Sequence, residues 1–147
     1  MGKGTTHLDC GWCGKSYPSE ELQRLSPCCE RPLLPRYDLA VLRSRFTPES
    51  LATREPTLWR YREVLPVRDD RFALTLGEGF TPLLDTPRLA RELKVERLWV
   101  KDEGQNPTGS FKARGLVMAV ARAWELGAFE LAIPSAGNAG SAAVGTK

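Results

Sequence analysis

The sequence lacks any long apolar run. No stretch approaches the about 20 consecutive apolar residues that a membrane-spanning helix needs, so no membrane partner is expected. The N-terminus also lacks the hydrophobic core of a secretory signal peptide, and this favours a cytoplasmic location. Solenoid-type repeats and low-complexity segments are absent as well. The single histidine, His7, stands near the N-terminus and is assigned no role.

A strong excess of one charge is also missing. The 21 lysine and arginine residues are interspersed with 18 aspartate and glutamate residues, which gives a formal net charge of +3. A nucleic-acid-binding protein normally presents a clustered basic face, so no nucleic-acid partner is expected. Hydrophobic residues make up 41% and charged residues 27% of the 147 positions, which is an ordinary composition for a globular chain.

The most informative stretch is residues 106–112, which read Asn-Pro-Thr-Gly-Ser-Phe-Lys. Residues 96–101 before it are rich in strand formers, and residues 113–126 after it are strong helix formers that stop at Gly127. Lys112 is therefore predicted to lie where a strand passes into a helix. Partial burial and the positive end of the helix dipole both disfavour an ammonium ion there, and a neutral amine can form a Schiff base with an aldehyde. A lysine at a solvated helix start is the alternative.

A second stretch repeats this layout. Residues 129–133 predict a short strand, residues 134–141 read Pro-Ser-Ala-Gly-Asn-Ala-Gly-Ser, and alanines that suit a helix follow. In an open parallel sheet, ligands bind beyond the carboxyl ends of the strands, where helix N-termini present free N–H groups. We therefore expect the two loops to face one crevice, with Lys112 on one loop and Ser135 and Asn138 on the other.

Together the two loops resemble the lysine and asparagine motifs of the fold-type II pyridoxal-phosphate enzymes, the tryptophan synthase β-subunit-like family. The resemblance implies an α/β fold with a doubly wound parallel sheet, part of which this chain would hold. It implies that Lys112 binds pyridoxal 5′-phosphate as a Schiff base, with Phe111 beside the cofactor. Asn138 would hydrogen-bond the cofactor's 3′-oxygen, and the loop with Ser135, Asn138 and Ala139 would receive the substrate carboxylate.

Two further segments resemble the threonine synthase group of that family: residues 77–83, Gly-Glu-Gly-Phe-Thr-Pro-Leu, and the cysteine-containing start. That group implies conversion of O-phospho-L-homoserine and water to L-threonine and phosphate, with a homodimer as the expected assembly of the complete enzyme. Other members of the family stay open, namely threonine or serine dehydratase, diaminopropionate lyase and cysteate synthase. A zinc-ribbon binding module with an inert α/β tail, a protein of a different class, stays open as well.

The four cysteines all stand in the first 29 residues. Cys10 and Cys13 form a C-x-x-C knuckle, and Cys28 and Cys29 follow at a distance that fits a small zinc ribbon with thiolate ligands. The adjacent second pair departs from this pattern, because the second knuckle of a ribbon normally separates its cysteines. A ribbon without metal and a disulfide are the alternatives, and a reducing cytosol disfavours the disulfide.

These signals divide the chain into a zinc-ribbon-like segment at residues 1–37, a helical connector at residues 38–70 and the start of a pyridoxal-phosphate-dependent catalytic domain at residues 71–147. Residues 141–147 stop in what should be the body of a helix. No glycine-rich loop for the cofactor phosphate follows the asparagine loop. We therefore expect a piece of a longer protein, which by itself is inactive and binds the cofactor weakly.

Several other stretches are interpreted as structural. Residues 56–65 predict a helix, and residues 86–93 predict a short helix with Thr86 as its N-cap. Asp102 and Glu103 are interpreted as polar residues at the end of a strand rather than as an acid and base pair. The helix after the lysine loop is expected to bury one apolar stripe: Leu116, Val117, Val120 and Trp124.

Overall fold

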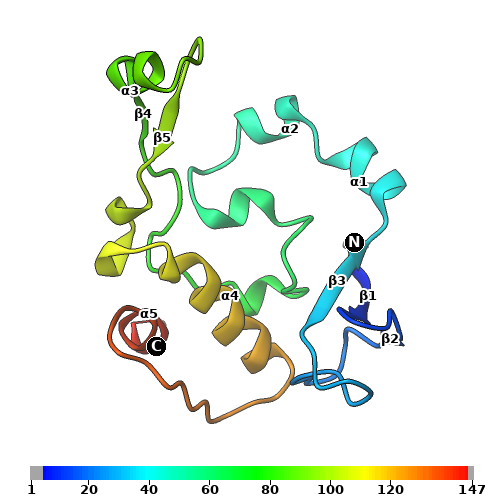
Figure 1. The fold of residues 1–147 in the computed structure, drawn as a ribbon. Coiled ribbons are helices and arrows are strands. Elements are labelled where there is room, and N and C mark those ends of the chain that lie inside the picture. Colours follow the sequence, from blue (N-terminus) through cyan, green and yellow to red (C-terminus); the bar gives the residue numbers. More distant parts are fainter. Residues whose placement is uncertain (1–4, 146–147) are drawn as a thin grey trace. The chain divides into compact units, whose positions relative to one another are not determined.

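The computed structural model describes residues 5–145, which form two compact units (Figure 1). The first unit contains the described residues up to Glu55 together with Trp59–Leu74 and Met118–Leu131. The second contains Pro56–Leu58, Thr75–Val117 and the described residues from Ala132 onward. None of the helices within residues 5–145 is long and apolar enough to cross a membrane.

A three-stranded antiparallel sheet opens the first unit. Its strands are β1 (Thr5–Cys10), β2 (Ser16–Tyr17) and β3 (Leu33–Tyr37), in the order β2-β1-β3. Leu8 lies opposite Tyr17 on one side of β1, and Cys10 lies opposite Leu33 on the other. Gly14 between β1 and β2 has a φ of 73°, which glycine adopts at no steric cost, so the chain can reverse directly after the C-x-x-C knuckle.

The chain after this sheet forms short helices. They are α1 (Leu39–Arg45), α2 (Pro48–Ala52) and the 3-10 helices η1 (Leu58–Tyr61) and η2 (Asp70–Phe72). The Asp38 carboxylate caps α1 by accepting a hydrogen bond from the Val41 N–H at 3.0 Å. A capping box formed by Thr47 and Ser50 opens α2. Local side-chain caps therefore stabilise helices that are too short to be stable alone.

The helix predicted for residues 56–65 is wrong, because only η1 forms there. In an α-helix the Arg60 carbonyl would accept from the Val64 N–H. Here it accepts from Arg54 Nη1 at 2.6 Å, and the Val64 N–H bonds the Tyr61 carbonyl at 3.0 Å instead. A hydrogen bond from Arg54, which lies outside the segment, therefore takes the place of one bond of the predicted helix.

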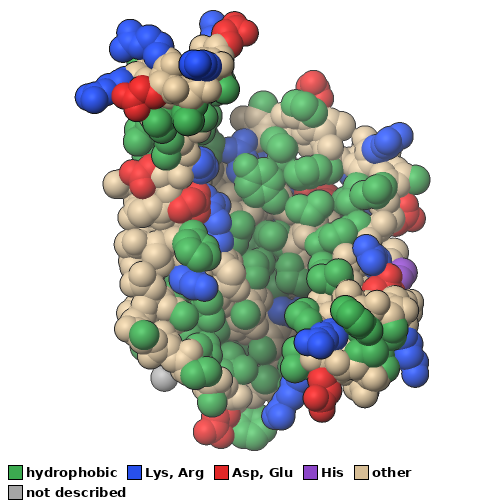
Figure 2. Space-filling view, viewed as in Figure 1, with side chains coloured by type: hydrophobic (Ala, Val, Ile, Leu, Met, Phe, Trp, Pro, Cys, Tyr) green, Lys and Arg blue, Asp and Glu red, His purple; other side chains and the backbone are tan. Residues whose placement is uncertain are grey.

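The second unit contains several short elements and one half of a long helix. The short elements are β4 (Leu83–Asp85), α3 (Pro87–Glu92), β5 (Trp99–Lys101), η3 (Glu103–Gln105), η4 (Pro107–Gly109) and α5 (Asn138–Val144). β4 and β5 pair antiparallel, with Leu84 opposite Val100. Thr86 stands at the N-cap of α3, but its hydroxyl donates to the Leu98 carbonyl at 2.9 Å and does not cap the helix. Basic and acidic side chains are interspersed on the surface around α3 (Figure 2).

The long helix α4 (Lys112–Glu125) begins in the second unit and ends in the first. Its fully buried residues recur every four positions and are Ala113, Val117 and Ala121. Of the residues predicted for the apolar side, Val117 is fully buried, and Leu116 and Val120 are half-buried. Trp124 is largely exposed and packs its ring against the edge of Phe72, with the ring centroids 4.8 Å apart. Gly127, with a φ of 88°, follows the end of the helix as predicted.

The strand predicted for residues 129–133 does not form. Phe129 is 97% exposed and Leu131 is also exposed, and no strand described within residues 5–145 pairs with this segment. Within residues 5–145, β5 pairs only with β4 and no parallel strand pair occurs, so the fold is mixed α/β with two small antiparallel sheets. The expected helix over residues 141–147 ends at Val144, and residues 146 and 147 lie outside the described residues.

Candidate functional site

The loop before Lys112 connects β5 to α4 through the two 3-10 helices η3 and η4. Lys112 is the first residue of α4, as the sequence predicts, and its side chain is exposed. Its Nζ lies 4.9 Å from the centroid of the Phe111 ring, which is also exposed. Thr108 and Gly109 both adopt the left-handed region, with φ of 69° and 66°. A β-branched residue there is strained, and such strain is typical of functional loops.

The loop before α5 is folded around a serine hydroxyl. Ser135 Oγ accepts hydrogen bonds from the N–H groups of Gly137 at 3.1 Å and Gly140 at 2.8 Å. Asn138 is the first residue of α5 and is exposed, and Ala139 after it is half-buried. α5 contacts η4, so the asparagine loop and the lysine loop lie together in the second unit. The structure therefore brings the predicted site residues onto neighbouring elements, and it engages the Ser135 hydroxyl in the loop's own backbone.

Glu103, which is interpreted from the sequence as a polar residue at the end of a strand, bonds residues on both sides of Lys112. Glu103 accepts from Arg114 Nε at 2.6 Å and Nη2 at 2.9 Å, from the Thr81 hydroxyl at 2.6 Å and from Asn106 Nδ2 at 2.8 Å. We call Thr81, Glu103, Asn106 and Arg114 the lysine-loop network. The hydrogen bonds from Arg114, above all, lower the pKa of Glu103 to about 2 against the opposing effect of burial.

The lysine-loop network also reaches residues 77–83. The Asn106 side chain is only 4% exposed, and its Oδ1 accepts from the Gly79 N–H at 3.2 Å. Next to Gly79, the fully buried Glu78 accepts from the Thr75 hydroxyl at 3.0 Å and the Leu76 N–H at 2.7 Å. The Gly-Glu-Gly segment is thus part of the framework around the lysine loop. No local signal could have revealed the bond between Gly79 and Asn106, because these residues are 27 positions apart in sequence.

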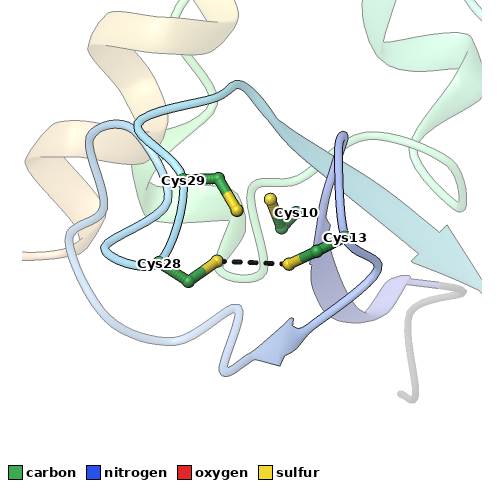
Figure 3. A group of neighbouring side chains, drawn as sticks. All are labelled: Cys10, Cys13, Cys28 and Cys29. Carbon is green, nitrogen blue, oxygen red and sulfur yellow. Dashed lines mark hydrogen bonds between the residues drawn. The ribbon is translucent and has the colours of Figure 1, made fainter.

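The four cysteines form one cluster in the first unit (Figure 3). Their Sγ atoms all lie within 4.8 Å of one another, the Cys13 and Cys28 sulfurs are 3.4 Å apart, and all four thiols are free. The adjacent Cys28 and Cys29 reach the same centre because the chain turns sharply around Ser26. The Ser26 carbonyl accepts from the Glu30 N–H at 2.8 Å, and Glu30 itself has a left-handed φ of 51°.

Two thiols of this cluster have pKa values that are shifted in opposite directions. Hydrogen bonds with the Cys13 backbone and with the Ser26 hydroxyl lower the pKa of Cys10 to about 6. The neighbouring Cys13 and Cys28 side chains raise the pKa of Cys29 to about 12. Four thiolates this close repel one another, so only a bound cation would allow all of them to be deprotonated together.

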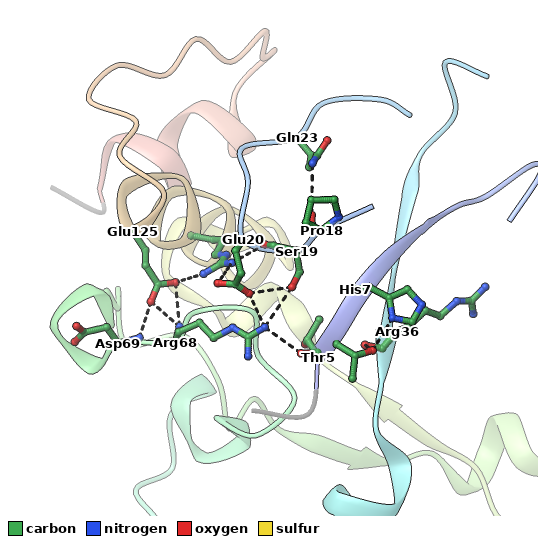
Figure 4. A network of polar contacts seen from close by, with 12 residues as sticks. Thr5, His7, Pro18, Ser19, Glu20, Gln23, Arg36, Arg68, Asp69 and Glu125 are labelled. Carbon is green, nitrogen blue, oxygen red and sulfur yellow. Dashed lines mark hydrogen bonds and ion pairs between the residues drawn. The ribbon is translucent and has the colours of Figure 1, made fainter. Parts of the chain in front are cut away.

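A second polar network holds the end of α4 in the first unit (Figure 4). We call it the ribbon–helix network, and its members are Thr5, Ser19, Glu20, Arg68, Asp69, Arg122 and Glu125. Glu125 accepts from the N–H groups of Arg68 at 2.7 Å and Asp69, and from Arg122. Arg122 also donates to the Ser19 carbonyl at 2.6 Å, and Arg68 donates to the Thr5 carbonyl at 3.0 Å. The end of α4 is thus bonded to the segment that carries the cysteines.

Comparison with known proteins gives the site its chemical context. Residues 74–145 match the model of the family described as "Pyridoxal-phosphate dependent enzyme". The chain is 42% identical over 130 residues to the threonine synthase of Methanocaldococcus jannaschii, which covers 88% of this chain and 32% of that protein. It is 40% identical over 136 residues to the threonine synthase of Methanosarcina acetivorans, covering 92% of this chain and 33% of that protein.

A shorter match has a higher identity. The chain is 51% identical over 86 residues to the threonine synthase of Halalkalibacterium halodurans, covering 58% of this chain and 24% of that protein. The chain spans about a third of the length of the first two relatives.

The donor set of the site fits the cofactor that the family description names. The lysine loop supplies an exposed amine beside an aromatic ring, and the neighbouring asparagine loop supplies an amide and backbone N–H groups. An aldehyde-bearing aromatic cofactor requires such an amine and such polar partners. Both loops lie inside the matched segment. Residues 74–145 of this chain therefore belong to the family of pyridoxal-phosphate dependent enzymes.

Proposed function

We propose that this protein uses pyridoxal 5′-phosphate to convert O-phospho-L-homoserine and water to L-threonine and phosphate. The observation that carries the proposal is the similarity over 88% and 92% of this chain to two proteins named threonine synthase. The matched part of the chain includes both the lysine loop and the asparagine loop. The cysteine-containing start, which most other fold-type II enzymes would not need, favours the same group.

Each residue of the two loops has a proposed task. Lys112 holds the cofactor through its amine and, once released, moves protons at the α and β carbons of the substrate. Phe111 lies against the cofactor ring, and the Asn138 amide hydrogen-bonds the cofactor's 3′-oxygen. The loop from Ser135 to Ala139 holds the substrate carboxylate and thereby orients the α proton. When bound, pyridoxal phosphate supplies an electron sink for the electrons released at the α carbon.

The complete catalytic domain is proposed to have a doubly wound parallel sheet, in which β5, the lysine loop and α4 form one strand–loop–helix unit. Family membership supports this, as does the order of those three elements along the chain. We further propose a homodimer that acts on a small molecule without nucleic acid or membrane. Sedimentation of the protein at several concentrations tests the assembly, and a monomer at every concentration would rule out the homodimer.

The cysteine cluster is proposed to bind one structural zinc ion. A tetrahedral zinc ion with bonds of about 2.3 Å places its thiolates about 3.8 Å apart, and the four sulfurs already lie within 4.8 Å of one another. Native mass spectrometry should find one zinc per chain and none after Cys29→Ser. Leu22→Ala, a change at an exposed residue between the two cysteine pairs, should keep the ion. A protein that is purified without chelator and takes up no zinc would contradict the site.

Reductive trapping tests the central role of Lys112. The protein is expressed from its complete reading frame, mixed with pyridoxal phosphate, reduced with borohydride and digested for mass spectrometry. We expect the pyridoxyl group on Lys112, its loss in Lys112→Ala, and its retention in Lys15→Ala, which changes another exposed lysine. A label elsewhere or nowhere would overturn the proposal.

Turnover then identifies the reaction. Release of phosphate and formation of threonine from O-phospho-L-homoserine are expected. Formation of a 2-oxo acid from threonine or serine, without phosphate release from O-phospho-L-homoserine, would instead identify a dehydratase of the same family.

A further inference from the structure

We propose that Glu103 is a positioning residue for Lys112, because its carboxylate closes the loop that presents the lysine and balances the charge of Arg114. The inference rests on the proposed covalent role of Lys112, and it assigns a task to a residue that the sequence alone did not distinguish from its neighbour Asp102.

The first argument is that Glu103 bonds both ends of the lysine-bearing segment. Before the lysine, Asn106 Nδ2 donates to the Glu103 carboxylate at 2.8 Å and to the Glu103 carbonyl at 3.1 Å. After the lysine, Arg114 donates twice, at 2.6 Å and 2.9 Å, to the same carboxylate. A segment whose two ends meet at one group has lost most of its freedom to shift. The direction of Lys112 is therefore set by this closure.

The second argument is that the closure is buried and anchored. Asn106 is 4% exposed and Thr81 is 6% exposed, and the Thr81 hydroxyl donates to Glu103 at 2.6 Å. Ala113, directly after Lys112, is completely buried, so the first turn of α4 cannot rotate without opening the core. Bidentate arginine–carboxylate pairs also fix orientation more tightly than single hydrogen bonds do. The network is therefore buried and bidentate, as expected for residues that hold Lys112 in place, and it differs from an ion pair on a solvated surface.

The third argument concerns charge. Arg114 lies two residues after Lys112, and an unpaired cation at that distance would disfavour a second positive charge near the lysine. The other charged groups around the loop are engaged elsewhere: Lys101 Nζ donates to the Thr81 carbonyl, Glu78 accepts from Thr75 and Leu76, and Asp102 accepts from Gly104 and Gln105. Neither η4 nor α5 carries a charged side chain. The Glu103 carboxylate forms an ion pair with Arg114, with 2.6 Å between Oε2 and Nε.

The test compares two adjacent carboxylates. In the described residues, the Asp102 carboxylate accepts from groups of its own 3-10 turn, at 3.1 Å from Gly104 N and 3.1 Å from Gln105 Nε2, so Asp102→Asn is the matched control for Glu103→Gln. The readouts are the rate of pyridoxal-phosphate labelling at Lys112 under borohydride and the pH midpoint of that labelling. In Glu103→Gln we expect labelling to slow on the order of tenfold and the midpoint to fall on the order of one pH unit. Asp102→Asn should match the wild type within about twofold.

A double variant separates charge from geometry. Glu103→Gln with Arg114→Gln removes both charges, so the pH midpoint should return to the wild-type value while labelling stays slow. Circular dichroism checks that each variant is folded at the temperature of the assay. Should Glu103→Gln fail to fold, Arg114→Lys keeps the charge pair without the bidentate geometry, and it should slow labelling with no change in the midpoint.

The outcomes distinguish the two proposals. A wild-type protein that carries no label on Lys112 overturns the proposed function. A wild-type protein that is labelled there, together with a Glu103→Gln variant that labels like Asp102→Asn in rate and midpoint, overturns the role of Glu103 and leaves the proposed function intact.

Discussion

The ribbon–helix network and the lysine-loop network bond opposite ends of α4, and they differ in what surrounds them. At the end of the helix, Glu125 accepts from two backbone N–H groups and an arginine, in a region without a proposed reacting group. At its start, Glu103 bonds only side chains and the residues it joins flank Lys112. Similar arginine–carboxylate pairs therefore have two different proposed roles, which are stability of the fold in one network and placement of Lys112 in the other.

Because the two networks differ in this way, loss of each one should change a different measurable property. Loss of the ribbon–helix network should lower the free energy of unfolding and leave the chemistry of the folded protein unchanged. Loss of the lysine-loop network should alter the labelling of Lys112 even where the protein stays folded.

The largest effect is expected for Glu125→Ala. The Glu125 side chain is only 8% exposed, and its removal leaves the N–H groups of Arg68 and Asp69 without their acceptor and the Arg122 charge without its nearest carboxylate. Such a loss costs about 3–5 kcal/mol. Chemical denaturation should show this decrease, and the exposed Glu130→Ala should change the free energy by less than about 0.5 kcal/mol. Equal effects of the two variants would show that the network does not stabilise the fold.

The next largest effect on the free energy of unfolding is expected at Gly79, whose N–H donates to Asn106 of the lysine-loop network. Gly79 has a φ of 119°, and a Cβ added there would lie 2.8 Å from the Leu58 backbone nitrogen. Gly79→Ala must move backbone as well as adopt a disfavoured φ, so we expect a cost of about 3 kcal/mol. Gly77 has a φ of 86° but nothing within 4 Å of its added Cβ, so Gly77→Ala should cost about 1 kcal/mol.

Thermal unfolding of the two glycine variants measures the difference. Similar melting temperatures would mean that residues 77–83 are free to move away from Leu58, and the lysine-loop network would then lose its anchor at Gly79.

The pH dependence of stability gives a third, smaller effect. The pKa of Glu103 falls from its ordinary 4.5 to about 2 on folding, so its contribution is complete above pH 4.5 and is lost as the pH falls towards 2. Because the side chain is 27% exposed, solvent screening reduces this contribution to about 1–2 kcal/mol. Denaturation at pH 7 and pH 3 should therefore show a smaller acid-induced loss in Glu103→Gln than in the wild type. An identical loss in both proteins would contradict the assigned pKa.

The contrast between the networks also explains what the sequence could predict. The lysine loop, β5 and the start and end of α4 follow from local signals, namely strand formers, a glycine-containing loop and a helix closed by Gly127. The partnership of Glu103 with Thr81 and Arg114 does not, because it joins residues that are 22 and 11 positions apart. Hydrogen bonds between residues this far apart in sequence form only in the folded chain, so they leave no periodic pattern in the sequence.

The incorrect predictions have the same origin. Residues 129–133 have strand-like composition, but none of the strands described within residues 5–145 pairs with them. In α4 the largest apolar side chains were expected inside, whereas the packing selects the small Ala113 and Ala121. At the cysteines, by contrast, the spacing predicts a zinc-ribbon-like segment, and the structure gathers all four thiols although Cys28 and Cys29 are adjacent.

The smallest effect concerns backbone strain in the lysine loop. Thr108 has a φ of 69°, which costs a β-branched residue on the order of 1 kcal/mol more than asparagine. Thr108→Asn should therefore raise the free energy of unfolding by about 0.5–1 kcal/mol, which a shift in the denaturation midpoint measures. Thr53 is exposed with an ordinary φ of −95°, so Thr53→Asn should bring no such gain. A Thr108→Asn variant that is no more stable than Thr53→Asn would show that the backbone of the lysine loop is not strained at Thr108. The lysine-loop network would then hold Lys112 without having to offset such strain.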